Sequence, residues 1–238
     1  MFTLFSTPNW FNGYDLLFAA VNLVIALLIA GYSWKIYRIN KENKFTYFSF
    51  AFILIALANI FKLITQGLIY YTPWRAVATR VVGPVVGMAQ AGVNYSDLFF
   101  RTGFFLSMIT MLGAWLLIYF VSQKKSGRLK SYYETSQIGL FIYLIGLISL
   151  VSNFKYSVFY LTSTVILGIT VLNYYKNYLN TDKNRNAFKV MWSFVLLLIG
   201  NIAFIFVFIF ESLYAVGEIF TLLGFLLLLY THHKVTHK

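Results

Sequence analysis

The sequence predicts an all-α integral membrane protein with seven transmembrane helices, and two observations predict this fold class. Of the 238 residues, 60% are hydrophobic and only 11% are charged, whereas a soluble domain is about 45–50% apolar and about 25% charged. The chain also contains seven runs close to the roughly 20 apolar residues that cross a bilayer. We expect one domain, residues 1–238, with spans at Tyr14–Trp34, Phe45–Tyr71, Leu98–Val121, Ser136–Ser152, Tyr156–Tyr175, Phe188–Phe210 and Leu213–Tyr230.

The first span precedes every basic residue, because the first Lys or Arg of the chain is Lys35. A cleavable signal peptide carries positive charge ahead of its apolar stretch. We therefore expect the first span to stay in the mature protein as a membrane helix.

The second and third spans are joined by the longest connection, Thr72–Asp97. It is rich in Val around Gly83 and Pro84. Turn residues between Val-rich runs are typical of a β-hairpin. We expect a short extracellular hairpin between the second and third helices; a re-entrant or interfacial helix and an irregular loop are the alternatives. The fourth span, Ser136–Ser152, is the shortest of the seven.

Basic residues indicate the orientation of the predicted bundle. Cytoplasmic loops of membrane proteins carry an excess of Lys and Arg, so the side that holds most of these residues faces the cytoplasm. We expect a plasma membrane protein with its N-terminus outside and its C-terminus in the cytoplasm. The net charge of +12 is then a topology signal, and the expected partner is the lipid bilayer, not nucleic acid. The basic residues on the predicted inner side are Lys35, Arg38, Lys41, Lys44, Lys124, Lys125, Arg128, Lys130, Lys176, Lys183, Arg185, Lys189, Lys234 and Lys238.

The spans before and after the fourth resemble each other in sequence. With an offset of 142 residues, residues 14–62 match residues 156–204 at seven of 49 positions, and Asn59 falls on Asn201. With an offset of 111, TMLGAWLLIY from Thr110 matches TLLGFLLLLY from Thr221 at six of ten positions. Because the paired helices run in the same direction, we expect a 3+1+3 parallel repeat. Its parts are residues 14–122, a linker helix at 136–152 and residues 156–230.

This layout resembles the seven-helix topology of SWEET-type sugar carriers and, more loosely, of microbial rhodopsins. The Pro-Gln signature of the sugar-carrier relatives is absent from the sequence. A retinal protein needs a Schiff-base Lys in its last span, and LYAVGEIFTLLGFLLLLY contains none. The resemblance is therefore one of topology, and we expect no retinal chromophore.

Polar residues inside the spans are candidate functional groups, because ionisable side chains are costly in a membrane. Asn59, Lys62 and Gln66 are spaced to lie on one face of the second span. Such a polar face is expected to point into the bundle rather than toward lipid. Glu218 lies at a similar depth in the last span, so we expect it to pair with Lys62.

Further polar residues complete the candidate ligand-binding set: Asp15 and Asn22 of the first span, Arg101 of the third and Asn201 of the sixth. Asp15 and Asn22 are seven residues apart, so they share one face of their helix. We expect the whole set to lie in the outer half of the bundle, around a small ligand. The other interpretation is that Lys62 and Glu218 form an ion pair that only joins two helices.

Small residues at helical spacing predict close packing between helices. They are Ala26 and Ala30 in the first span, Gly139 and Gly146 in the fourth, and Gly217, Thr221 and Gly224 in the last.

The residue types present exclude several functions. The chain has no Cys, and His232, His233 and His237 all lie in the last seven residues, so the spans offer no thiolate or imidazole for a metal, a haem or a nucleophile. We therefore expect no cofactor, no metal and no enzymatic activity, and we interpret the end THHKVTHK as a cytoplasmic tail. We favour a small-molecule transporter; the alternative is a seven-helix sensor or receptor that signals through a cytoplasmic partner. A homo-oligomer is compatible with either function.

Overall fold

The computed structural model describes residues 8–11, 13–70, 95–123 and 156–236 of the chain. These residues form long α-helices and no strand, and six of the helices are long and apolar enough to cross a membrane. The described part of the chain is therefore all-helical, and its six long apolar helices indicate a membrane-embedded protein. The helices are α1 (Tyr14–Asn40), α2 (Asn43–Tyr70), α4 (Tyr95–Ser122), α6 (Tyr156–Asn180), α7 (Arg185–Ile205) and α8 (Leu213–Thr236), with short 3-10 helices η1 (Asn9–Phe11) and η2 (Phe206–Phe208).

Two predicted elements cannot be compared with the structure. The fourth span, Ser136–Ser152, lies outside the described residues, so the count of seven spans stays a prediction. Most of the predicted hairpin, residues 72–94, also lies outside them. Residues 95–97, which the sequence assigned to the same connection, belong instead to the first turn of α4.

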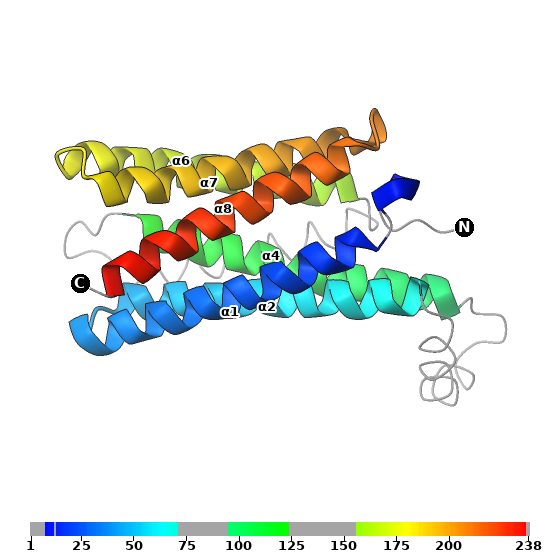
Figure 1. Cartoon of the computed structure of the whole chain (residues 1–238), viewed down its shortest axis with the longest axis horizontal. Helices are drawn as coiled ribbons and strands as arrows, with labels where there is room; N and C mark the ends of the chain where they lie inside the picture. The colour runs from blue at the N-terminus through cyan, green and yellow to red at the C-terminus, as the bar shows by residue number, and fades with distance from the viewer. Residues whose placement is uncertain (1–7, 12, 71–94, 124–155, 237–238) are drawn as a thin grey trace, which may run out of the picture.

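The six long helices form a closed ring. Neighbouring helices contact each other in the order α1, α2, α4, α6, α7, α8 and back to α1. Figure 1 shows that α1 begins at one end of the bundle and α8 ends at the other. We call these the N-terminal end and the C-terminal end of the bundle; α2 and α7 run from the second to the first.

Each helix buries one face in the ring and exposes apolar side chains on the other. In α1 the buried face includes Ala19, Asn22 and Ala26. Its exposed face carries Leu17, Val21, Val24 and Leu28. A lipid environment requires helices whose backbone groups hydrogen-bond within the helix and whose outer surface is apolar. The exposed side chains of this bundle meet that requirement.

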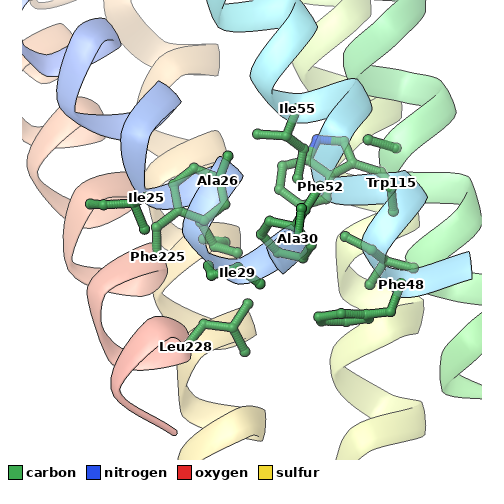
Figure 2. Packing of buried hydrophobic residues seen from close by; sticks show 14 of the residues in the cluster. Ile25, Ala26, Ile29, Ala30, Phe48, Phe52, Ile55, Trp115, Phe225 and Leu228 are labelled. Carbon is green, nitrogen blue, oxygen red and sulfur yellow. The ribbon is translucent and has the colours of Figure 1, made fainter. Parts of the chain in front are cut away.

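Two clusters of buried apolar residues fill the ring at different levels. The first, which we call the C-terminal core, includes Ile29, Phe52, Trp115, Phe194 and Phe225. Figure 2 shows Ile29 of α1, Phe52 of α2, Trp115 of α4 and Phe225 of α8 gathered in this cluster. The second, the N-terminal core, is centred on the aromatic and apolar side chains of Phe11, Phe104, Met108, Phe159, Phe204 and Tyr214.

Several helices extend beyond the apolar runs that predict them. α1 continues to Asn40 and stops because Lys41 adopts a left-handed conformation with φ 56° and donates its N–H to the Tyr37 carbonyl. The sixth predicted span, Phe188–Phe210, is not one continuous α-helix, since α7 ends at Ile205 and η2 follows. Hydropathy reports which residues tolerate lipid, whereas these ends depend on backbone hydrogen bonds.

Residues 231–236 of the segment interpreted as a tail, which include His232 and His233, are part of the bundle; this corrects the interpretation for them, and His237 lies outside the described residues. α8 continues to Thr236. The His232 ring stacks on Phe48 with centroids 5.1 Å apart, and His233 Nδ1 lies 3.0 Å from the hydroxyl of Tyr32. These contacts hold the end of α8 against α1 and α2.

The start of α7 provides a test of local stability. Asn184 is its N-cap, and the side-chain oxygen accepts a hydrogen bond from the N–H of Asn186 at 2.9 Å. We expect Asn184→Ala to lower the free energy of unfolding by about 1 kcal/mol, because one N–H at the helix start loses its partner. Unfolding in mixed micelles of mild detergent and SDS, followed by circular dichroism, measures the loss. The control Asn180→Ala, at an exposed position, is expected to change it by less than about 0.5 kcal/mol; equal losses would contradict the capping role.

Candidate functional site

A cavity of about 70 Å³ lies inside the ring and receives side chains from all six long helices. The cavity lies between the two apolar cores, because residues of both line it. Phe104, Met108 and Phe204 belong to the N-terminal core, whereas Trp115 and Phe225 belong to the C-terminal core. The remaining lining residues are Asn22, Ala58, Asn59, Lys62, Ser107, Met111, Phe159, Tyr160, Asn201, Glu218 and Thr221.

Lys62 and Glu218 form an ion pair at this cavity, as the sequence predicts. Lys62 Nζ of α2 donates to Glu218 Oε1 of α8. The Glu218 side chain is 3% exposed and the Lys62 side chain 16%. Lys62 Nζ also lies 5.6 Å from the centre of the Tyr214 ring, within the range of a cation–π contact. The pair therefore joins α2 to α8 from a position with little access to solvent.

Asn59 and Asn201 make the same contact at equivalent positions of the two predicted repeats. The Nδ2 group of Asn59 donates to the Ile55 carbonyl at 2.9 Å, and that of Asn201 donates to the Leu197 carbonyl at 2.9 Å. Both bonds stay within one helix. Both amides line the same cavity. A purely packing role suggests hydrogen bonds between helices, and these two bonds do not join one helix to another.

Three lining residues carry polar atoms that are buried without a hydrogen-bond partner in the described part of the chain. They are the side-chain oxygen of Asn22, the indole N–H of Trp115 and the hydroxyl of Thr221. Asn22 is 3% exposed and Trp115 is 2% exposed. A buried polar atom without a partner costs about 1–3 kcal/mol, so these atoms favour an occupant that can hydrogen-bond to them.

Asp15 and Gln66 are brought together away from the cavity. Gln66 Nε2 donates to Asp15 Oδ2 at 2.8 Å, which links α2 to α1. The other Asp15 oxygen accepts from the backbone N–H groups of Gly13 and Leu16. Neither residue lines the cavity. Of the predicted binding set, Asn22, Asn59, Lys62, Asn201 and Glu218 therefore line the cavity, and Asp15 and Gln66 do not.

Arg101 belongs to α4, but its side chain lies outside the described residues. Trp115 is not among the residues that the sequence predicts for the site, and Thr221 is predicted from the sequence only as a packing residue. The position of Trp115 in the sequence could have identified it. Trp is usually enriched at membrane interfaces, and this Trp lies well inside its span. Thr221 offered no comparable signal, because a Thr in a helix commonly bonds to its own backbone.

Comparisons with models of protein families, with curated proteins and with solved structures found no match. The cavity itself therefore provides the argument for function.

Proposed function

We propose that the protein is a membrane carrier that moves a small solute through the cavity between the two apolar cores. The observation that carries this proposal is the position of the polar side chains. They gather inside the ring, with an apolar cluster toward each end of the bundle. Each core serves as a barrier on one side of a bound solute, as alternating access requires.

The order of the ring supports a two-part carrier. Around the ring, a first set of three helices, α1, α2 and α4, is followed by a second set, α6, α7 and α8. The contacts of α1 with α8 and of α4 with α6 join the two sets. A rotation of half a turn about the ring axis therefore exchanges the two sets: the contacts α1–α2 and α2–α4 correspond to α6–α7 and α7–α8. This pattern is the one expected for a parallel repeat whose axis runs along the membrane normal. Rocking of one set against the other opens the cavity to each end in turn.

The distribution of charge supports a protein of the plasma membrane in which the C-terminal end of the bundle faces the cytoplasm. That end holds the connection between α1 and α2 and the connection between α6 and α7. Lys41, Lys44, Lys183 and Arg185 lie in or beside these connections. Excess Lys and Arg on one side is the usual mark of the cytoplasmic face.

Flux into proteoliposomes tests the carrier proposal. We expect protein-dependent, saturable uptake of at least one solute from a panel of radiolabelled urea, glycerol, glycine, guanidinium and glucose. Thr221→Val is expected to lower this uptake about tenfold, because it removes a polar group from the cavity while preserving its volume. The matched control is Thr162→Val, whose hydroxyl bonds to the Val158 carbonyl of its own helix and which does not line the cavity; it is expected to leave uptake unchanged.

Two results would contradict the proposal. Equal loss of uptake in both Thr variants would separate transport from the cavity. If a solute binds to the protein but is not transported, the carrier proposal is wrong and the sensor function is favoured.

A further inference from the structure

We infer that the solute of this cavity is small, carries no net charge and both donates and accepts hydrogen bonds, as small amides do. This inference rests on the proposed carrier function and names its substrate class. Three features of the lining carry it: its charge balance, its unpartnered polar atoms and its size.

The charges at the cavity already compensate each other. Among the described residues that line it, Lys62 and Glu218 are the charged ones, and they form an ion pair. A cation or an anion that enters would leave one net charge inside an apolar bundle, where an uncompensated charge is strongly disfavoured. A solute without net charge enters with the pair intact.

The unpartnered atoms specify the hydrogen bonds that a solute can make. The Asn22 oxygen accepts, the Trp115 indole N–H donates, and the Thr221 hydroxyl does either. A solute that only accepts or only donates leaves at least one of these atoms unsatisfied. A small amide or urea carries both N–H donors and a carbonyl acceptor, so it matches the set.

The volume limits the solute to a few heavy atoms. The cavity measures about 70 Å³, roughly half the volume of about 150 Å³ in which an apolar protein cavity holds benzene. Urea and acetamide are of the appropriate size, whereas a hexose is too large.

Three planar molecules of nearly equal size and shape test the charge requirement directly: urea, guanidinium and nitrate. We expect uptake of urea into proteoliposomes, corrected for leakage into protein-free liposomes and with the membrane potential clamped, to exceed that of either ion at least about tenfold. Asn22→Leu and Trp115→Phe are each expected to lower urea uptake about tenfold, and the control Thr162→Val is expected to leave it unchanged. Uptake of guanidinium or nitrate equal to that of urea would overturn the substrate class while leaving the carrier proposal intact.

A binding measurement separates failure of the substrate class from failure of transport. Saturation-transfer NMR on the purified protein in detergent compares the methyl group of acetamide with that of acetate, which has the same shape and a negative charge. We expect transfer to acetamide that Asn22→Leu abolishes, and no transfer to acetate. Transfer to acetamide without flux of any solute would overturn the carrier function alone, and equal transfer to acetamide and acetate would overturn the substrate class.

Discussion

Glu218→Gln is expected to destabilise the folded protein by about 3–5 kcal/mol, because it leaves the Lys62 ammonium buried without its counter-charge. The carboxylate is 3% exposed and belongs to the ion pair between α8 and α2. Water therefore has little access to compensate the remaining charge. Equilibrium unfolding in mixed micelles of detergent and SDS measures the free energy of unfolding of the variant against that of the unmodified protein.

A second variant separates the charges from the packing at the same positions. The double variant Lys62→Met with Glu218→Gln removes both charges and keeps similar volumes, so we expect it to recover most of the lost stability. The exposed pair of Lys44 and Glu42, at 2.5 Å with side chains 50% and 52% exposed, provides the control. Glu42→Gln is expected to cost less than about 1 kcal/mol. A double variant as unstable as Glu218→Gln alone would show that the unpaired charge is not the cause.

The membrane helices were predictable because one physical requirement governs them over long stretches. A helix that crosses lipid must be apolar for about 20 residues, and this requirement places α1, α2, α4, α6, α7 and α8 within a few residues of their observed positions. The exact ends were not predictable by this route. Lys41 stops α1 through its φ angle. The last turns of α8, which ends at Thr236, are held by the packing of His232 on Phe48. Neither effect depends on hydropathy.

The candidate site was predictable in part, for a related reason. Lys62 and Glu218 are conspicuous in a sequence because charge is rare inside a span, and matching their depths suffices to pair them. The separation of Asp15 and Gln66 from the cavity depends on which way each helix is rotated in the ring. Trp115 was missed because its large apolar ring hides one N–H donor, and only the packed structure shows that this donor is buried without a partner.

The close approach of α7 and α8 beside the cavity predicts a second large effect. A Cβ atom at Gly200 would lie 2.9 Å from the Gly217 carbonyl oxygen and 2.8 Å from the Thr221 hydroxyl. Because the carbonyl belongs to the backbone, the two helices must separate to admit the methyl group. We expect Gly200→Ala to destabilise the protein by about 1–3 kcal/mol, measured by the same unfolding in mixed micelles.

At Gly168 the same substitution is expected to change the stability in the opposite direction, so this position is the control for Gly200→Ala. No heavy atom of the described residues outside the helix's own backbone lies within 4 Å of a Cβ built at this position in α6. Gly168→Ala is therefore expected to stabilise the protein by about 0.5–1 kcal/mol, because Ala loses less backbone entropy in a helix than Gly does. Both substitutions add the same methyl group to a helical Gly, so a difference in sign reports the helix–helix contact alone. Stabilisation by Gly200→Ala as well would mean that α7 and α8 do not approach each other this closely, and the Thr221 side of the cavity would then be wider than described.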